Sequence, residues 1–445
     1  MRASDIRNTF IKFFKDKNHL YLTPSNLVNY NDPELMFTNA GMNQLKKVFL
    51  GQDRIQDRIQ DRRLVNSQPC LRISGKHNDI EEVGVDMYHH TLFEMLGNWS
   101  LNDYFKKEAI EWAWELLTEV YKLDKKDLYV TVFGGDENDR TSKDTETYDI
   151  WRRIIEEDHI LFFSKKDNFW EMGEKGPCGP CTEIHIDIRS DEEKKKTKGA
   201  KLVNTGHPEV IELWNIVFMQ YERLDDKTLK QLNEKFVDTG MGFERLCMVL
   251  QNKKSTYDTD IFSAYMQMLT HLCAHKYNNS NDSEDIAFRV ISDHIRTIIL
   301  CLGEGLIPSN IKEGYVLRML IRRAQKYGYM YLGFREPFLH NFISIVAEQF
   351  KDIKPIADDI KSGIETILKK EESGFLKVIN NGRKKVEKLI EKYKAANVLS
   401  LNGEDVFKLK DTYGLPVEIT ELILKEHGMT YDKAAYQEKV ARIRH

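Results

Sequence analysis

The sequence predicts an α+β fold followed by an all-helical region. Runs of alternating apolar and polar residues, typical of β-strands, are interleaved with segments whose apolar residues recur at helical spacing. Beyond residue 260 the strand patterns become rare and helical patterns dominate. A chain of 445 residues is also too long for a single hydrophobic core. We therefore expect two domains, residues 1–255 and 256–445.

The composition is that of a soluble globular protein, with 41% hydrophobic and 31% charged residues. No run approaches the ~20 consecutive apolar residues that a membrane helix needs. The N-terminus lacks the apolar region of a signal peptide, and the six cysteines are expected to be reduced thiols. We therefore expect a cytoplasmic enzyme with no membrane partner. A net charge of −4 excludes a uniformly basic surface but leaves room for a local basic face.

The first predicted helix has Ser4 as its N-cap and carries Ile6, Phe10, Phe13 and Phe14 at helical spacing, so one face should pack onto a core. Residues 52–63 repeat a charged four-residue unit that suits a solvated helix or loop. Helical spacing then predicts helices over residues 104–121 and 148–157, and β-rich runs predict strands over residues 128–133 and 160–163.

Two alternating runs joined by a polar loop predict a long antiparallel hairpin over residues 69–101. Arg72 and Lys76 in its first half suit phosphate binding, but salt bridges to Asp79, Glu81 or Glu82 explain them equally well.

The second half of this hairpin contains the pair His89 and His90. Adjacent strand residues point to opposite faces, so we expect at most one of the two to be functional.

Glycine, proline and cysteine dominate residues 168–185, which predicts a tightly turning loop near a ligand. Cys178, Cys181 and His185 suggest zinc, but the sequence supplies no clear fourth ligand, so zinc is not expected. Trp170 suits either the core or a pocket wall. Residues 191–201 are charged throughout and predict a solvated loop.

A long strand is predicted over residues 210–221, where Asn215 and Val217 share one face and Trp214 lies on the other. Burying an amide among apolar neighbours is costly, so Asn215 is expected to hold a ligand or a neighbouring backbone.

Residues 237–246 read VDTGMGFERL and predict a strand that turns into a helix. Gly240 and Gly242 allow close approach of a ligand, and the helix N-terminus favours anions. Asp238 and Arg245 would present a carboxylate to a cation and a guanidinium to an anion. An ordinary glycine-rich connection gives the same pattern.

Helices dominate the second domain, and one carries a ridge of basic residues. Residues 286–335 contain eight Lys or Arg against three Asp or Glu, and Arg318, Arg322 and Lys326 recur at every fourth position. Nucleic-acid phosphates suit this ridge, although a solvated basic face gives the same pattern.

Glycines and an Asn-Asn-Gly sequence interrupt residues 351–396, which favours helical hairpins over one continuous helix. Another helix is predicted to begin at Pro416. The sequence stops at His445 within a helix-like run, as expected of a piece of a longer protein.

Together these stretches resemble the amino-terminal catalytic and tRNA-recognition part of the alanyl-tRNA synthetase family. The resemblance covers nearly the whole chain. It is carried by residues 31–43, 75–79, HHTLFEMLGN (89–98), GPCGPCTEI (176–184), WNIVFMQ (214–220), DTGMGFER (238–245) and DTYGLP (411–416).

The resemblance implies a class II synthetase core, an antiparallel sheet flanked by helices, followed by a helical tRNA-binding domain. It implies ATP with Mg²⁺, L-alanine and the acceptor stem of tRNA(Ala) as ligands. Arg72 would bind the α-phosphate of ATP, Arg245 the terminal phosphates and Asp238 the alanine ammonium. The implied ATP site further includes Lys76, His90, Trp170, Leu213, Trp214 and Gly242, the alanine site Asn215 and Val217, and the tRNA site Asn310, Arg318, Arg322 and Asp411.

We expect neither a metal held by the protein alone nor an oligomer. Full-length family members carry an editing domain with a metal site and a further C-terminal region, neither of which has a counterpart in these residues.

Three alternatives stay open on the residues alone. A non-catalytic tRNA-binding relative would lose Arg72, Asp238 or Arg245, but all three are present. A zinc-dependent nucleic-acid module would bind stoichiometric zinc. A synthetase-like core for another small amino acid differs only in the pocket, and only the extent of the resemblance favours alanine.

Overall fold

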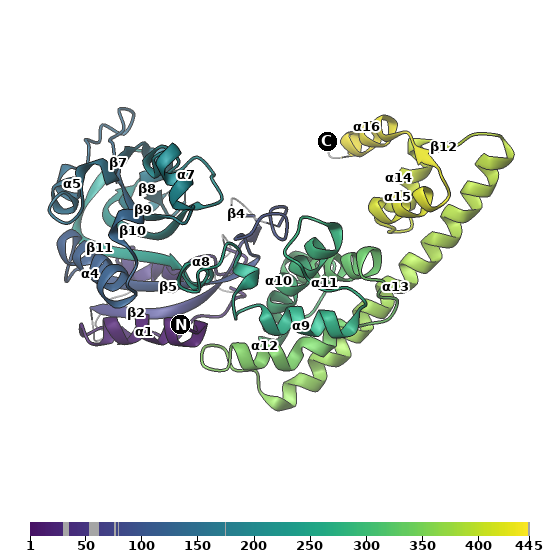
Figure 1. The fold of residues 1–445 in the computed structure, drawn as a ribbon, viewed down its shortest axis with the longest axis horizontal. Coiled ribbons are helices and arrows are strands. Elements are labelled where there is room, and N and C mark those ends of the chain that lie inside the picture. The colour runs from purple at the N-terminus through teal and green to yellow at the C-terminus, as the bar shows by residue number, and fades with distance from the viewer. Residues whose placement is uncertain (30–34, 53–61, 75–76, 79, 174, 444–445) are drawn as a thin grey trace. The chain divides into compact units, whose positions relative to one another are not determined.

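The chain forms two compact units, each with its own core. The computed structural model describes residues 1–29, 35–52, 62–74, 77–78, 80–173 and 175–443 (Figure 1). Unit 1 comprises Met1–Ala264 with Gln349–Pro355, and unit 2 comprises Tyr265–Glu348 with Ile356–His445. Lys76, Asp79 and most of the charged repeat at 52–63 lie outside the described residues.

A nine-stranded sheet forms the centre of unit 1, in the order β1-β2-β5-β11-β10-β9-β6-β7, with β8 paired to β9 (Figure 1). In this order, every neighbouring pair from β2 through β5, β11, β10 and β9 to β6 is antiparallel. This confirms the predicted antiparallel core and the hairpin of β2 and β5. Parallel pairs at the two ends, β1 with β2 and β6 with β7, make the sheet mixed. The strands are β1 (Leu20–Tyr21), β2 (Arg63–Leu71), β5 (Leu92–Leu101), β6 (Leu128–Phe133), β7 (Ile160–Phe163), β8 (Phe169–Glu171), β9 (Gly176–Asp187), β10 (Val210–Arg223) and β11 (Leu229–Gly242), and β3 (Ile73–Ser74) pairs separately with β4 (His77–Asn78).

The helices of unit 1 flank this sheet, and α1 (Ala3–Lys15) lies along β2. α1 buries Ile6, Phe10 and Phe14 as predicted, but Phe13 is only partly buried, and the N-cap is Arg2 rather than Ser4. The predicted helix over residues 104–121 is α4 (Lys106–Glu115) followed by the π-helical turn η2 (Leu116–Val120). The helix predicted over residues 148–157 is α5 (Thr145–Trp151), which begins and ends earlier than predicted. The remaining bounds are η1 (Gly41–Leu45), α2 (Lys46–Phe49), η3 (Lys125–Asp127), η4 (Glu157–His159), α6 (Lys165–Asn168), α7 (Asp191–Lys196), η5 (Gly199–Lys201), α8 (Phe243–Leu250) and η6 (Thr256–Asp258).

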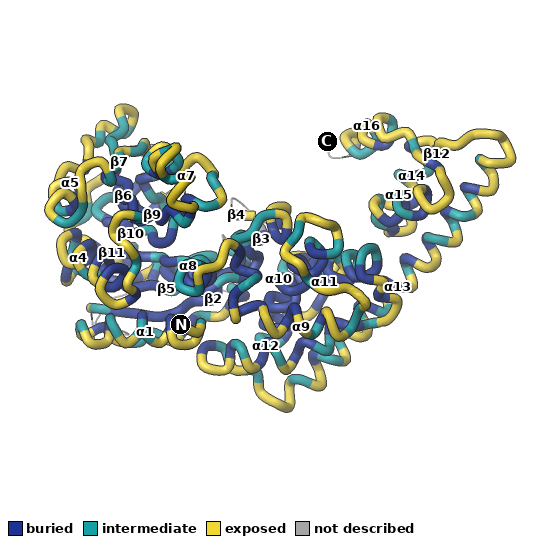
Figure 2. Tube along the Cα trace, in the orientation of Figure 1, coloured by how far each residue is buried: buried dark blue, intermediate teal, exposed yellow. Residues whose placement is uncertain are grey.

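Within the glycine- and proline-rich stretch predicted to be a loop, residues 176–185 instead belong to the buried strand β9 (Figure 2). Phe169–Glu171 form the short strand β8. A Cβ on Gly179 would lie 1.9 Å from the carbonyl oxygen of Phe218 on β10, so only glycine allows this approach. The register between β9 and β10 shifts at the same place, between the pairs of Val217 and Tyr221. Gly179 and Pro180 lie within this irregularity, whereas Pro177 is in the paired part of the strand, opposite Glu222. Because proline cannot donate to a regular ladder, the irregularity accommodates Pro180.

The charged residues 191–201, predicted to be a solvated loop, contain the short helix α7. The Ser190 hydroxyl accepts from the backbone N–H of Glu193, and the Glu193 carboxylate accepts from the backbone N–H of Ser190. This capping box starts the helix although none of its residues is buried. The predicted exposure is confirmed, and the predicted loop is wrong.

The end of the first compact unit lies beyond residue 255, where the sequence places the domain boundary. The backbone N–H of Thr256 donates to Met87 O (3.0 Å), and its hydroxyl pairs with Nε2 of His90 (2.8 Å). These contacts tie a segment without strand character to the loop that precedes β5.

Unit 2 is mainly helical, as predicted, with one additional pair of short parallel strands, β12 and β13. No helix in the described part of the chain is long and apolar enough to cross a bilayer. The elements of unit 2 are α9 (Ser263–Leu272), which begins in unit 1, α10 (Ser283–Gly303), α11 (Lys312–Tyr331), η7 (Leu339–Phe342), α12 (Ile343–Gln349), α13 (Asp358–Ala395), β12 (Ser400–Leu401), α14 (Gly403–Asp411), α15 (Val417–Glu426), β13 (Thr430–Tyr431) and α16 (Lys433–Ile443).

One continuous helix of 38 residues, α13, replaces the predicted helical hairpins (Figure 1). Glycine in a helix interior costs up to ~1 kcal/mol. Buried apolar residues spaced along α13, from Ile364 to Ile390, offset that cost. At Gly382 the lack of a side chain also admits Leu415, because a Cβ there would lie 2.7 Å from Leu415 Cδ1.

We predict opposite effects of alanine at two glycines of α13. Gly363→Ala should raise the free energy of unfolding by up to ~1 kcal/mol, because a Cβ at Gly363 meets no atom within 4 Å. Gly382→Ala should lower it, because Leu415 must move. Urea unfolding followed by circular dichroism measures both, and destabilisation by Gly363→Ala would contradict this account of the helix.

Candidate active site

The junction of β11 and α8 carries two of the predicted residues. Gly242 is the N-cap of α8, and Arg245 lies in the first turn. Nη1 of Arg245 donates to the carbonyl oxygen of Glu212 (3.1 Å), and the guanidinium lies 5.0 Å from the ring centroid of Tyr88. These contacts hold a cation beside a helix N-terminus, whose free N–H groups also favour an anion.

Arg72 lies directly after β2, with its guanidinium 4.9 Å from the ring centroid of Phe93. Its Nε is buried and has no hydrogen-bond partner among the described residues. Of the salt-bridge partners considered from the sequence, Asp79 is not described, and neither Glu81 nor Glu82 pairs with Arg72. A buried donor left unpaired is costly, and an anionic ligand would satisfy it.

A cavity of about 110 Å³ brings the two arginines together. Five residues implied for the ATP site line it, namely Arg72, His90, Leu213, Gly242 and Arg245. Its other walls are Tyr88, His89, Phe93, Met95, Glu212, Gly240 and Glu244, of which the sequence analysis did not predict Tyr88, Phe93, Met95, Glu212 and Glu244 as site residues.

Glu212 is the notable addition, because it is a carboxylate among the cations. Burial raises its pKa, the charge of Glu183 raises it further, and Arg245 opposes the rise. A lone acidic residue inside the apolar run of β10 was the available signal in the sequence.

Asp238 lies on β11, four residues before Gly242, and is nearly buried, with 7% exposed area. The indole N–H of Trp99 on β5 donates to Asp238 Oδ1 at 2.6 Å. Burial raises the pKa of Asp238 to about 7, and the bond from Trp99 opposes the rise. A carboxylate of this kind gains strongly from a cation that restores its charge.

The three residues implied for alanine lie on one face of two neighbouring strands. Val217 on β10 is opposite Asp238 on β11, and Asn215 is opposite Gly240. Oδ1 of Asn215 is buried and lacks a hydrogen-bond partner within the described residues. A nearly buried carboxylate and an unpaired amide oxygen thus share a face, which suits a substrate with an ammonium group.

Two predicted ATP residues do not line the cavity. Trp214 is fully buried on the other side of the strand, with its ring centroid 5.9 Å from that of Phe10 on α1. Trp170 packs in the hydrophobic cluster that contains Val217, on the alanine side. Lys76 lies outside the described residues.

Both His89 and His90 line the cavity, because they lie in the loop before β5 rather than on the strand. The expectation that alternation separates them is therefore wrong. Nδ1 of His89 pairs with Asp86, whereas the ring of His90 stacks on Phe262, with 5.1 Å between the centroids.

The model of the family described as tRNA synthetases class II (A) matches residues 5–445. The chain belongs to this family. The alanine--tRNA ligase of Cytophaga hutchinsonii is 48% identical over 441 residues, which cover 99% of this chain and 50% of that protein. That of Parabacteroides distasonis is 50% identical over 433 residues, covering 97% and 49%. The chain therefore spans about half the length of the curated relatives it matches.

Among solved structures, apo histidyl-tRNA synthetase of S. aureus is similar with a TM-score of 0.34 and 12% identity, over 60% of this chain and 75% of that one. A similarity this low adds nothing to the class II assignment.

Unit 2 of this class II synthetase contains the residues implied for tRNA. Asn310 and Asp411 are exposed, at the loop before α11 and at the end of α14. Arg318 pairs with Glu371 through two nitrogens (2.9 and 3.0 Å) and donates to the Asn310 side-chain oxygen. Arg322 lies 5.5 Å from the ring centroid of Phe375, and its pKa is lowered by burial and then by Arg318.

The basic ridge is therefore less charged than its sequence suggests. Besides Arg318, Lys326 is neutralised by Glu418 at 2.7 Å. Two more of the eight basic residues, Arg289 and Arg296, are fully buried in α10. The local excess of positive charge in the sequence is not an equal excess on the surface.

The cysteines considered for zinc pack in different hydrophobic clusters. Cys178 packs with Phe133 and Phe169, and Cys181 with Val217 and Met219. Nε2 of His185 pairs with Glu183 (3.0 Å). Among the described residues no group of three or more His, Cys, Asp or Glu is placed to hold a metal ion.

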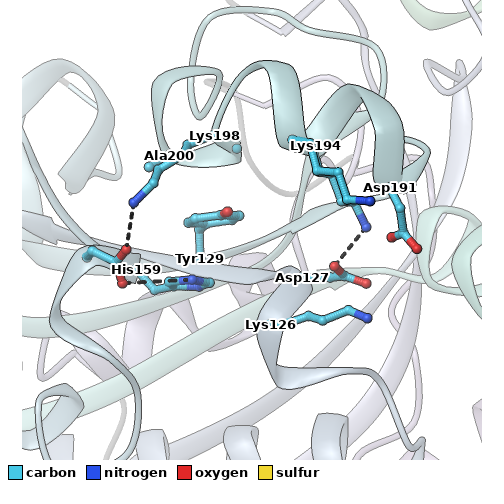
Figure 3. Close-up of a pocket in the computed structure, with 11 residues that line it drawn as sticks. Lys126, Asp127, Tyr129, His159, Asp191, Lys194, Lys198 and Ala200 are labelled. Atoms are coloured by element: carbon cyan, nitrogen blue, oxygen red, sulfur yellow. Dashed lines mark hydrogen bonds and ion pairs between the residues drawn. The ribbon is translucent and has the colours of Figure 1, made fainter.

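A larger cavity of about 370 Å³ is lined by none of the implied site residues (Figure 3). Of its lysines, Lys194 and Lys195 belong to α7, Lys198 directly precedes η5, and Lys126 belongs to η3. Carboxylates lie beside them. Lys194 pairs with Asp127 (2.7 Å) and Lys198 with Asp158 (3.2 Å), as Figure 3 shows. With these charges already paired, this cavity is a weaker anion site than the one that holds Arg72 and Arg245.

We predict that Asp238→Asn stabilises unit 1 above neutral pH. The folded protein binds a proton at Asp238 up to about pH 7, whereas an unfolded aspartate loses it near its usual pKa of 3.8, so stability falls as pH rises through this window. Asparagine removes that loss and still accepts from Trp99. The gain should be on the order of a few kcal/mol at about pH 8 and should vanish towards about pH 4.

Thermal unfolding at both pH values measures this difference. A variant that is less stable than the parent at both would contradict the assigned cost of the buried carboxylate.

Proposed function

We propose that this chain activates L-alanine with ATP to give alanyl-adenylate and pyrophosphate, and then transfers alanine to the 3′ end of tRNA(Ala). The observation that carries the proposal is the arrangement along one β-strand and the helix that follows it. Asp238 is a buried carboxylate on β11. Gly242 at the end of that strand and Arg245 in the first turn of α8 line the cavity that also contains Arg72. The relatives named alanine--tRNA ligase support alanine as the amino acid.

The first step needs positioning and charge neutralisation rather than a general base. The carboxylate of alanine is already ionised at neutral pH, and one of its oxygens attacks the α-phosphorus of ATP. The bond from that phosphorus to the bridging oxygen breaks, and pyrophosphate leaves with the electron pair. Arg72 would neutralise the α-phosphate and Arg245 the terminal phosphates, while Asp238 would hold the ammonium group.

Mg²⁺ would enter with ATP as the counter-ion of its phosphates and neutralise charge on the leaving pyrophosphate. The residues fit such a cation, because Glu212 lies in the cavity with a pKa raised by burial and by Glu183. A nearby cation would relieve both effects.

In the second step the terminal adenosine hydroxyl of tRNA attacks the alanyl carbonyl carbon, and AMP leaves. Asn310 and Asp411 would read the acceptor stem. Arg318 is better suited to fixing the Asn310 amide than to binding a phosphate, because Glu371 already pairs with it. This activity belongs to protein synthesis in the cytoplasm.

Amino-acid-dependent ATP–pyrophosphate exchange tests the activation step. We expect the fastest exchange with alanine and slower, detectable exchange with serine and glycine, because one small group discriminates by only ~1–3 kcal/mol. Asp238→Ala should abolish exchange. Asp226→Ala, an exposed aspartate in the turn between β10 and β11, should leave it unchanged.

The outcomes separate the alternatives. Absence of exchange with every amino acid, in a folded protein that still binds tRNA, would indicate a non-catalytic tRNA-binding protein. Exchange that is faster with serine or glycine than with alanine would assign the core to another small amino acid.

A further inference from the structure

The indole of Trp99 is placed to act on the substrate anchor. Trp99 on β5 is directly opposite Asp238 on β11 in the sheet register. Its Nε1 is 2.6 Å from Oδ1, and within the described residues this is the hydrogen bond that the carboxylate receives. Trp99 is fully buried, whereas Asp238 keeps a small exposed area. A short bond to a carboxylate is a charge-assisted one, and it fixes direction as well as charge.

Two glycines hold the indole ring in this position. A Cβ on Gly97 would lie 2.4 Å from Cη2 of Trp99, and one on Gly41 would lie 2.8 Å from Cζ2. Both distances are shorter than any real Cβ contact. The ring also packs in a cluster that includes Leu64, Val217 and Met219. Residues of β2, β5, β10 and η1 thus pack around the indole ring. This packing fixes the direction in which its N–H points.

Within the described part of the chain, no charged residue contributes to the pKa of Asp238. It faces Trp99 on β5 and Val217 on β10, and neither side chain titrates. Burial raises its pKa and the indole N–H lowers it, with no further contribution from the described residues. Deleting the N–H therefore removes the interaction that favours the ionised form in the free protein.

We propose that Trp99 is a positioning residue for alanine: its N–H occupies Oδ1 of Asp238 and leaves Oδ2 for the substrate ammonium. This inference rests on the proposed function, because it assigns Asp238 to the ammonium group. Trp99 acts through Asp238 and need not touch the reacting atoms.

Trp99→Phe tests the proposal, because phenylalanine keeps a ring between the two glycines and deletes only the donor and part of the bulk. In the exchange assay we expect KM for alanine to rise about tenfold, the effect of one hydrogen bond to a charged group. KM for ATP and kcat should stay close to the parent values.

The pH dependence gives a readout that a purely structural role would not move. In the parent, KM for alanine should rise as pH falls below about 7, because the carboxylate becomes protonated. In Trp99→Phe this rise should begin at a higher pH. If the phenylalanine variant does not fold, 3-benzothienylalanine at position 99 keeps the bicyclic shape without the N–H and serves the same comparison.

Trp151→Phe is the matched control. Trp151 is also fully buried, and its Nε1 donates to Thr182 Oγ1 at 2.9 Å. Its loss should lower thermal stability but leave KM for alanine and its pH profile unchanged.

Two failures are distinguishable. If Trp99→Phe keeps the parent KM and pH profile while Asp238→Ala abolishes exchange, Trp99 is structural and the proposed function stands. If the parent itself shows no exchange with alanine, the proposed function fails, and the role of Trp99 fails with it.

Discussion

The burial of one carboxylate, Asp238, is the constraint on which the candidate site depends. In the free protein this group lies in the sheet with a pKa of about 7, and among the described residues it accepts one hydrogen bond, from Trp99. Such a position costs stability, because the ionised form has lost its hydration. The same cost becomes binding energy when an ammonium group arrives, since the cation restores a charge that the protein by itself disfavours. Under the proposed function, the sheet carries this electrostatically unfavourable group at the place where it would bind a small zwitterion.

A second buried network links the helix that carries Arg245 to the sheet that carries Asp238. Arg7 on α1 donates twice to Glu94 on β5, with both distances 2.6 Å. Ser67 on β2 donates to the same carboxylate, and the backbone N–H of Glu94 donates to Glu244 on α8 (3.0 Å). One chain of polar contacts thus connects α1, two strands and the helix that presents Arg245. Buried charges paired in this way are costly to break, which fixes α8 against the sheet.

Sequence patterns predicted the elements whose signals are local. The turn from Asp238 through Gly242 into α8, the strand around Asn215 and the alternation of β2 and β5 all follow from period and turn chemistry. The continuous helix α13 was not predicted. Its packing against residues such as Leu415 outweighs the helix-destabilising effect of the glycines within it. β9 was missed for a similar reason. Gly179 and Pro180 of β9 lie opposite an irregularity on β10, which the sequence of β9 alone does not reveal.

The site shows the same division. Arg72, Asp238 and Arg245 could be named from motifs, whereas the role of Trp99 depends on a contact between residues 139 positions apart. The pKa of Glu212 is raised by burial and by Glu183 and lowered by Arg245. The guanidinium of Arg318 is paired with the carboxylate of Glu371. These contacts join residues that are far apart in the sequence. Sequence patterns could therefore identify the residues but could not predict their charge states.

Under the proposed function, Asp238 becomes fully ionised when it receives the ammonium of alanine, and this change can be measured. Isothermal titration calorimetry of L-alanine binding in buffers of different ionisation enthalpy measures the protons released. At about pH 7, where Asp238 is half-protonated, binding should release about half a proton, and Asp238→Asn should release none. Alanine binding with the same heat in every buffer, hence no proton release by the parent protein, would contradict the account.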